Sequence, residues 1–355
     1  MKKNIIQICP TFPPNTGGVG NYTKLLADFL KKKKINSKIL VSDHLDNKNK
    51  KQTLFGKKNK NLISLLEKIN SNVVILHFSG YGYATRGLCF NLIKSLEKWK
   101  QINKNRTLIT IFHEIYATGP IYRMSYWTSL PQKYLAKRLL KLSNVALATS
   151  KHNNIILSSF EKKKKIIYSN IFSTIGEIKK NKKLNTRKNI AIIFGNTYQK
   201  QILYKDILIN RNQYESILKK MSIKRIIDIG PNVEISKKIK FIGIKKVGVK
   251  SKNYISLLLR NSKVGLVFYP VNQMTKSSII AAYASHGLVI INLCKEKIYK
   301  TNEFLSGIHY VSKIKENNFS NLQKIANKAF KHYKENALDK TVSLLIGIIK
   351  NKKTK

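Results

Sequence analysis

Three glycines stand where an apolar run passes into a helical pattern near the start of the chain. The run "NIIQIC" is followed by "PTFPPNTGGVGNY", which holds Gly17, Gly18 and Gly20, and then by the apolar-periodic "TKLLADFLKK". In open α/β sheets ligands bind beyond the carboxyl ends of strands, and free N–H groups at a helix start attract anions. Gly17 and Gly18 are therefore candidates to approach a diphosphate or a sugar; the alternative is a tight turn. The spacing differs from G-x-G-x-x-G, so a nicotinamide dinucleotide is not indicated.

A second candidate anion site lies at the expected start of a later helix. The stretch "YPVNQMTKSSIIAAYASHG" places Lys276, Ser277 and Ser278 directly before an apolar helical pattern. A serine at a helix start caps free N–H groups, and the lysine beside it adds a positive charge. This cluster can hold a diphosphate, and the alternative is an ordinary helix cap.

Two histidines lie at or near the ends of strand-like runs. His113 follows "TLITIF", and His77 lies in "NVVILHFS". A histidine at such a place can donate a hydrogen bond to a sugar hydroxyl, and its backbone carbonyl or neutral ring can stabilise developing positive charge. For His113 we favour a role in a reaction over simple packing. For His77 packing is favoured, with a place beside Tyr22 on the acceptor side as the alternative.

Aromatic and basic residues gather in "IYRMSYWTSLPQKYLAKRLLKLS". Lysines at every fourth position share one helical face, namely Lys133, Lys137 and Lys141. Tyr126 and Trp127 precede the expected helix and can sit at the level of lipid headgroups. Each lysine near an anionic leaflet contributes about 1 kcal/mol. The segment therefore predicts contact with a membrane or an acceptor; the alternative is a core-facing amphipathic helix with a solvated outer face.

The elements that must position these residues alternate between strand and helix. Short, apolar, β-branched runs are typical of buried parallel strands, and they occur at residues 4–9, 37–42, 72–79, 107–114 and 144–150. After a charged stretch near residues 170–188, a second series of strands follows at 190–196, 224–231, 239–244, 263–270 and 287–293. Helical patterns of the second series lie at 211–221, 251–261, 277–286 and 318–336. We predict an α/β fold of two Rossmann-like, doubly wound domains, residues 1–175 and 188–335, followed by a helix and basic tail at 336–355.

The composition limits the possible binding partners and the cellular compartment of the protein. The net charge is +51, yet only eight of the 68 Lys and Arg residues are arginine. Nucleic-acid binding is the commonest use of such an excess, but AT-rich codon usage explains this lysine-rich, arginine-poor composition equally well. Among anionic partners we favour a membrane surface over DNA. Three distant cysteines, the lack of a signal peptide and the lack of a long apolar run predict a cytoplasmic protein, at most peripheral on the inner face of the membrane.

The motifs occur in an order that resembles the retaining glycosyltransferases of family 4. "FPP" and "GGVGNYTKLLADFL" resemble the N-terminal signature of that family, and "TLITIFHEI" resembles its strand ending in a histidine and an acidic residue. "IAIIFGN" resembles the opening strand of its second domain, and "AAYASHGLVIINL" its helix, glycine and strand. The resemblance extends over residues 4–312 and implies the GT-B fold, in which two Rossmann-like domains face each other across a cleft.

This resemblance implies roles for several residues. His113 would contact the donor sugar or the reacting centre, and Gly195 matches a glycine of the family. Asn196 stands where the family has arginine, so Lys200 or Lys205 would replace the missing cation at the departing diphosphate; the alternative is a solvated lysine.

The family's Glu-x7-Glu motif is missing. Met274 and Ala282 occupy its two positions, so neither carboxylate is available to hold the donor sugar or the ribose. Lys276, Ser277 and Ser278 lie where the diphosphate would then be held. The donor sugar, the nucleotide base, the acceptor and the linkage are left open.

These features predict a glycosyltransferase that moves a sugar from a nucleotide-diphosphate sugar to a glycan or lipid-linked acceptor in surface polysaccharide synthesis. The resemblance implies a hexosyltransferase-like, retaining, metal-independent reaction that needs no cofactor beyond the nucleotide sugar as co-substrate. The alternative is a catalytically inactive sugar-binding or partner subunit of the same fold. Nucleic acid is disfavoured as a partner because RNA-binding signatures and interleaved aromatic and basic residues are missing.

Overall fold

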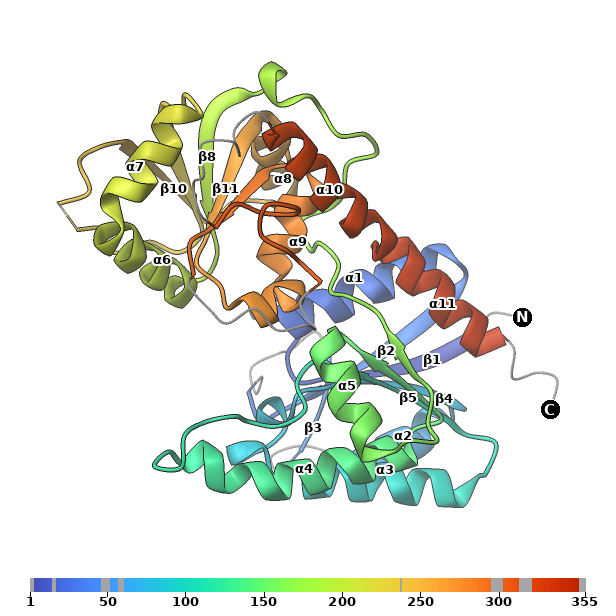
Figure 1. Ribbon diagram of the computed structural model, residues 1–355. Coiled ribbons are helices and arrows are strands. Elements are labelled where there is room, and N and C mark those ends of the chain that lie inside the picture. Colours follow the sequence, from blue (N-terminus) through green and yellow to red (C-terminus); the bar gives the residue numbers. More distant parts are fainter. Residues whose placement is uncertain are drawn as a thin grey trace. The chain divides into compact units, whose positions relative to one another are not determined.

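Two compact units make up the chain in the computed structural model (Figure 1). Unit 1 comprises Met1–Asn170 and Leu338–Lys355, and unit 2 comprises Ile171–Ala337. The structure describes residues 3–14, 17–45, 52–56, 61–236, 238–294, 303–312 and 321–350. Each unit is built on a parallel β-sheet whose apolar side chains are buried beneath helices.

In the described residues of unit 1, the sheet has seven parallel strands in the order β3-β2-β1-β4-β5-β6-β7. The strands are β1 (Lys3–Cys9), β2 (Ile35–Ser42), β3 (Thr53–Phe55), β4 (Val73–Phe78), β5 (Thr107–Phe112), β6 (Val145–Ala148) and β7 (Ile166–Tyr168). β1 pairs with both β2 and β4, so the strand order reverses direction between β1 and β4. In a doubly wound sheet this reversal opens a crevice at the carboxyl ends of the two strands.

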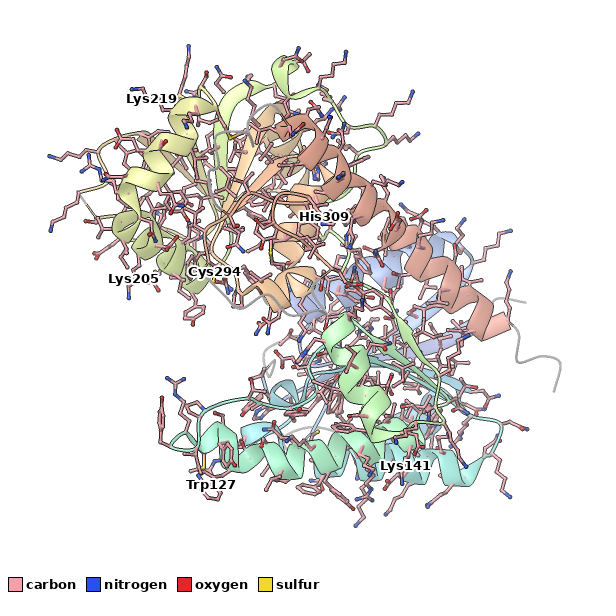
Figure 2. The ribbon with its side chains drawn as sticks, viewed as in Figure 1. Trp127, Lys141, Lys205, Lys219, Cys294 and His309 are labelled. Carbon is pink, nitrogen blue, oxygen red and sulfur yellow. The ribbon has the colours of Figure 1, made fainter. Side chains whose placement is uncertain are left out.

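The helices of unit 1 connect these strands, except for the C-terminal α11. They are α1 (Gly18–Lys32), α2 (Leu62–Ile69), α3 (Phe90–Ile102), α4 (Met124–Leu142), α5 (Lys151–Phe160) and α11 (Leu338–Lys350), with single turns at Gly80–Gly82 and Thr85–Gly87. The long helix α4 carries Trp127 near its start and Lys141 near its end (Figure 2). It begins at Met124 and contains Pro131, so Tyr126 and Trp127, which were expected to precede the helix, belong to its first turn.

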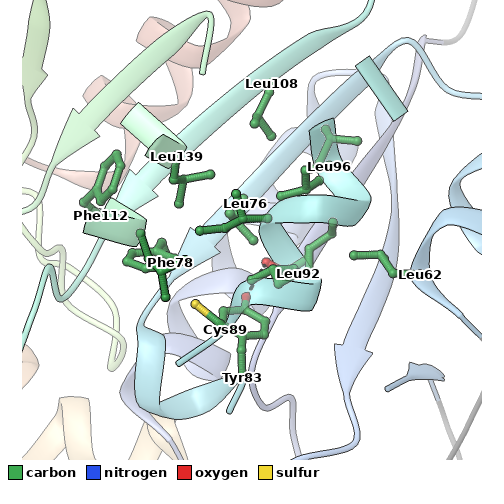
Figure 3. Packing of buried hydrophobic residues seen from close by; sticks show 14 of the residues in the cluster. Leu62, Leu76, Phe78, Tyr83, Cys89, Leu92, Leu96, Leu108, Phe112 and Leu139 are labelled. Carbon is green, nitrogen blue, oxygen red and sulfur yellow. Dashed lines mark hydrogen bonds between the residues drawn. The ribbon is translucent and has the colours of Figure 1, made fainter. Parts of the chain in front are cut away.

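Alternating residues of the unit 1 strands face different helices. Leu76, Phe78, Leu108 and Phe112 pack against side chains of α2, α3 and α4, including Leu139 (Figure 3). On the opposite face Cys9, Ile39 and Val41 pack with Ala27 of α1. Because side chains alternate along a strand, a residue between two of these core side chains, such as His77 between Leu76 and Phe78, lies on this second face.

The C-terminal helix α11 belongs to unit 1. It contacts α1, and Leu338, Val342, Leu345 and Ile349 are buried. Ser169 and Thr341 share a buried hydrogen bond of 3.0 Å between their hydroxyl groups. The last five residues, part of the predicted basic tail, lie outside the described residues. In the described part of the chain, every helix is too short or too polar to span a bilayer.

The described part of unit 2 contains five parallel strands in the order β10-β9-β8-β11-β12. The strands are β8 (Lys188–Phe194), β9 (Arg225–Ile229), β10 (Gly243–Gly248), β11 (Ser262–Val267) and β12 (Val289–Asn292). Its helices are α6 (Thr197–Ile209), α7 (Arg211–Lys220), α8 (Lys252–Asn261), α9 (Ser278–Ser285) and α10 (Leu322–Glu335), with 3-10 turns at Leu184–Thr186 and Val271–Lys276. Successive residues of β8 face opposite sides of the sheet, so Ile192 and Ile193 belong to two separate apolar clusters. Here the strand order reverses between β8 and β11.

The sequence patterns missed some elements and displaced one. Helices α5 and α6 and the three-residue strands β3 and β7 were not predicted, and the strand expected at residues 239–244 is observed as β10 at Gly243–Gly248. In α6 the inward face includes the polar Lys200 and Asp206, which are both buried. These two residues interrupt the apolar period by which an amphipathic helix is recognised.

Candidate functional site

The carboxyl edge of the unit 1 sheet brings the two predicted histidines together. His77 lies on β4 and His113 directly follows β5, the neighbouring strand. Nδ1 of His77 is 3.3 Å from Nε2 of His113, and Nε2 of His77 is 2.9 Å from Oε1 of Gln7 on β1. Gln7 in turn donates from Nε2 to the Ser37 hydroxyl on β2 at 2.8 Å. A continuous polar chain therefore crosses the point where the strand order reverses.

Tyr22 of α1 packs against both imidazoles. Its ring meets His77 edge-on with centroids 5.7 Å apart and His113 with centroids 4.9 Å apart. Tyr22 is 1% exposed and His77 is fully buried. Neither side chain reaches the surface of unit 1, which agrees with the packing role favoured for His77, and a place on the acceptor side stays a prediction for both residues. Both contact His113.

Burial keeps both histidines neutral. It lowers the pKa of His113 from 6.5 to about 3. The pKa of His77 is lowered well below 6.5, first by burial and then by the nearby His113. Two neutral imidazoles in contact can donate or accept hydrogen bonds, and they carry no charge that would attract a phosphate.

The backbone around His113 is held from two sides. The amide of His113 donates to the carbonyl of Phe78 at 3.0 Å, and Nδ2 of Asn153 donates to the carbonyl of His113 at 3.3 Å. The Ser79 hydroxyl donates to Oε2 of Glu114 at 2.5 Å. Glu114 therefore links the turns after β4 and β5. A positioning role of this kind fits it better than a reacting role.

The three glycines at the start of α1 have different surroundings. A Cβ on Gly20 would lie 2.5 Å from the carbonyl oxygen of Thr11, and one on Gly17 would lie 2.7 Å from the Thr11 hydroxyl. Close packing against Thr11 therefore accounts for these two. Around Gly18, the first residue of α1, no atom of the described residues lies within 4 Å of the Cβ position. Gly18 is thus the member of the predicted pair that leaves room for a ligand at the start of the helix.

In unit 2 the predicted donor residues adjoin one another at the carboxyl edge. A Cβ on Gly195, after β8, would meet Cδ1 of Ile279 in the first turn of α9 at 3.1 Å. A Cβ on Gly230, after β9, would lie 2.3 Å from the carbonyl oxygen of Gly195. Asn196 caps α6, because its side chain accepts from the amide of Gln199 at 2.9 Å. The ends of β8 and β9 and the first turn of α9 thus lie close together, with glycine at both strand ends.

Lys200 does not face this edge as a free cation. Its ammonium lies 2.5 Å from Oδ1 of Asp228 and donates to the carbonyl of Pro231 at 2.5 Å. The side chains of Lys200 and Asp228 are 2% and 1% exposed. Tyr204 donates to the other carboxylate oxygen at 2.7 Å, which adds to burial in raising the pKa of Tyr204. The prediction that Lys200 replaces the missing arginine at a diphosphate is wrong, because its charge is neutralised inside unit 2.

Lys205 lies on the exposed side of α6. Eight residues separate it from Thr197, the first residue of the helix, which corresponds to about 12 Å along the axis. It therefore lies two turns away from the strand ends that gather around Gly195.

The cluster at residues 276–278 forms the start of α9. Ser277 is buried and caps the helix by accepting from the amide of Ile280 at 3.3 Å. Lys276 ends the preceding 3-10 turn with intermediate exposure, and Ser278 is the first helical residue. The cap confirms the helix start expected here, and it leaves the free N–H groups of the first turn at the carboxyl edge of the sheet.

The positions of the missing carboxylates are part of the apolar core. Met274 and Ala282 are both 0% exposed within the unit 2 cluster. Nearby, Asn292 at the end of β12 exchanges two hydrogen bonds with the backbone of Tyr269, at 3.0 and 2.8 Å. Asn292 thereby fixes the loop that leads into the cluster.

Sequence reasoning missed Gln7 and Asn292, although each left a signal. Gln7 is the polar residue inside the apolar run "NIIQIC", and Asn292 lies within "GLVIINL". A polar residue in a strand buried on both faces needs a partner, and the structure supplies that partner in each case.

Helix α4 carries an exposed apolar stripe. Trp127, Leu130 and Tyr134 are 61%, 65% and 57% exposed, and their spacing places them on one side of the helix. Tyr126 is 42% exposed and meets Trp127 edge-on with centroids 5.6 Å apart. The leucines of the other side, Leu135 and Leu139, are fully buried.

The predicted lysines of α4 have different surroundings. Lys137 and Lys141 are exposed and extend the stripe toward the end of the helix. Lys133 is partly buried, with its ammonium 4.7 Å from the centroid of the Tyr116 ring. Two of the three lysines are therefore available to an anionic partner of this surface.

A scan against protein-family models and a search of curated proteins find no match for this chain. Solved structures match over nearly its whole length. An alpha-glucosyltransferase in complex with UDP-glucose and abasic-site DNA is 10% identical, with a TM-score of 0.59 over 98% of this chain and 99% of that one. A trehalose-6-phosphate structure from E. coli, bound with UDP-2-fluoro glucose, is 10% identical, with a TM-score of 0.59 over 99% of both chains. A Listeria monocytogenes protein assigned as a UDP-N-acetylglucosamine 2-epimerase is 9% identical, with a TM-score of 0.61 over 99% and 98%.

These matches define the class of fold. Two Rossmann-like units with parallel sheets, similar over the whole chain to GT-B proteins, make this a GT-B fold and confirm the fold predicted from the sequence. The similar proteins include transferases and an epimerase, so the shared fold does not by itself choose the reaction.

Proposed function

We propose that this protein is a glycosyltransferase that uses a nucleotide-diphosphate sugar. The observation that carries the proposal is the neutral, buried His113 at the carboxyl edge of unit 1, where the strand order reverses. A fold shared with proteins bound to UDP and UDP sugars supports the proposal but does not decide it.

In the proposed reaction unit 2 holds the nucleotide diphosphate. The free N–H groups at the start of α9 and the ammonium of Lys276 balance the charge that grows on the departing diphosphate. The ends of β8 and β9 carry glycines, Gly195 and Gly230, so the backbone there can approach the nucleotide. Binding by these groups needs no metal ion or further cofactor, and we propose that the nucleotide sugar is the co-substrate.

Unit 1 supplies His113 to the sugar. A neutral imidazole can hydrogen-bond a sugar hydroxyl without adding a positive charge beside an anomeric carbon that itself becomes positive. We propose retention of configuration at that carbon, in line with the family that the sequence resembles, with a hexose as the transferred group.

The acceptor in this proposal is a glycan or lipid-linked molecule of surface polysaccharide synthesis, reached at the cytoplasmic face of a membrane. The exposed stripe of α4 with Trp127, Leu130 and Lys137 supports this choice over a nucleic acid. Aliphatic side chains such as Leu130 suit a lipid headgroup region, whereas recognition of base edges in DNA often uses bidentate arginine, which is scarce here.

The alternative is a catalytically inactive relative that binds sugars or serves as a partner subunit. The missing carboxylates at Met274 and Ala282 favour it. A panel of nucleotide sugars, incubated with purified full-length protein, separates the proposals when released nucleotide diphosphate and new sugar products are both measured. Turnover that requires His113 and Lys276 supports the transferase. Binding without turnover supports the inactive relative. An epimerised nucleotide sugar without release of the diphosphate would contradict both proposals and indicate an epimerase.

A further inference from the structure

Four side chains, three on adjacent strands and the fourth directly after the next strand, form one hydrogen-bonded row in unit 1. Ser37 lies on β2, Gln7 on β1 and His77 on β4, and His113 follows β5, in the order of the strands in the sheet. Gln7 is register partner to Ile39 and His77 to Ile111, so all four side chains share the face covered by α1. Gln7 and His77 are 0% exposed.

The donors and acceptors of this row run in one direction. Because Nε2 of Gln7 donates to Ser37, its Oε1 faces His77 and can only accept. His77 therefore carries its proton on Nε2. Its Nδ1 is then an acceptor, so the neutral His113 at 3.3 Å donates from its own Nε2.

This arrangement leaves Nδ1 of His113 with a lone pair. In an imidazole ring the two nitrogens point in different directions, so Nδ1 is turned away from His77. His113 is 7% exposed, the largest exposure among the three members Gln7, His77 and His113. The row therefore ends on an acceptor atom at the edge of unit 1 where ligands of doubly wound sheets bind.

Stability alone does not account for the row. Buried polar groups gain little net free energy from their hydrogen bonds, and apolar side chains of similar shape would suit this face, as Cys9, Ile39 and Val41 do. A fully bonded polar row does specify one arrangement, because each member leaves its neighbour a single proton position.

We propose that Gln7 and His77 are positioning residues that hold His113 in its Nε2–H tautomer and present Nδ1 as an acceptor to a hydroxyl group of the bound sugar. The inference rests on the proposed function for the identity of the ligand. It assigns His113 as the acceptor of this hydrogen bond, where the sequence suggested a donor.

The tautomers can be measured without any turnover. Nitrogen chemical shifts of protein labelled with 15N-histidine distinguish a protonated from an unprotonated ring nitrogen, and His77→Asn and His113→Asn variants assign the signals among the seven histidines. We expect His77 and His113 to carry their protons on Nε2 in the native protein, and Gln7→Met to populate the other tautomer of His113. A native protein with the His113 proton on Nδ1 would overturn the inference.

Kinetics then test the consequence. Gln7→Met keeps the size of the side chain but removes the acceptor, and we expect kcat/KM to fall about tenfold. Gln7→Glu can only accept, so at about pH 8, where imidazoles are neutral, we expect it to retain kcat/KM to within about threefold. Ile39→Met alters the same buried face next to Gln7 without touching the row, and it serves as the matched control.

Each result has a definite meaning. Equal losses in Gln7→Met and Ile39→Met, or equal losses in Gln7→Met and Gln7→Glu, would show that Gln7 serves packing only. If native protein turns over no donor, the proposed function fails. The nitrogen shifts of native and Gln7→Met protein then decide whether the row sets the tautomer of His113.

Discussion

The Lys200 ammonium lies 2.5 Å from the Asp228 carboxylate, and both side chains are almost completely buried inside unit 2. The pair joins α6 to β9, and Tyr204 and the carbonyl of Pro231 occupy further hydrogen-bonding positions around it. A lysine that the sequence suggested for a phosphate therefore serves the internal structure of its unit. Its charge is already neutralised by Asp228.

Replacement of Lys200 should destabilise the protein more than it affects the donor site. Lys200→Met leaves the Asp228 carboxylate buried without its partner, and we expect the free energy of unfolding to fall by about 3–5 kcal/mol. The double variant with Asp228→Asn should recover part of that loss. Denaturant unfolding measures both. Lys205→Met, on the exposed side of the same helix, is the control and should leave stability unchanged. A stable Lys200→Met protein that has lost donor affinity would restore Lys200 as a phosphate ligand.

Acid should weaken unit 1 through its two buried histidines. In the unfolded chain these imidazoles take up protons near pH 6.5, whereas the pKa of His113 in the folded unit is about 3 and that of His77 is also far lower. The unfolded state therefore binds more protons as the pH falls below 6.5, and each histidine reduces the free energy of unfolding by about 1.4 kcal/mol per pH unit. This loss is absent at pH 7 and above.

Urea midpoints at several pH values test this slope. A variant with both His77→Asn and His113→Asn should lose less stability between neutral and acidic pH than the native protein does. The exposed His44→Asn is the control and should keep the native slope. An identical slope in all three proteins would contradict neutral burial of the pair.

The glycines at the start of α1 should separate packing from binding. Gly20→Ala places a Cβ 2.5 Å from a backbone oxygen of Thr11, so we expect a loss of stability of about 1–3 kcal/mol. Gly18→Ala has space for its methyl group and should not lower stability, yet it narrows the approach to the first N–H groups of the helix. Thermal unfolding and titration with nucleotide sugars measure the two effects. Equal stability of both variants would show that the close approach of Thr11 does not require glycine at position 20.

The stripe on α4 should bind anionic membranes. We expect Trp127→Ser together with Leu130→Ser to reduce sedimentation with vesicles that contain anionic lipid about tenfold or more, because the apolar anchors are lost. Tyr198→Ser removes a side chain that is 66% exposed in unit 2 and should have little effect. Added salt should weaken native binding because Lys137 and Lys141 contribute. Tighter, sequence-independent binding to oligonucleotides than to vesicles would instead make nucleic acid the partner.

Part of the site could be predicted because strand ends and helix starts are visible in the sequence. The start of α9 after its cap Ser277 and the strand end before His113 were expected from local patterns, and both are observed. Lys200 could not be placed in the same way. Its residue type is that of a phosphate ligand, and its burial depends on Asp228, which lies on a different strand of the unit.

The amino-acid sequence alone determined that two series of buried strands alternate with helices. Strands that are buried on both faces are short apolar, β-branched runs, which can be recognised locally in the sequence. It also placed His113 and Gly195 at strand ends. Only the tertiary structure decided which polar groups meet. Gln7 and His77 are 70 residues apart and become partners because β1 and β4 are neighbours in the sheet, and sequence distance carries no information about such pairing. The protonation of His113 likewise follows from burial beneath α1, which depends on how the whole unit packs.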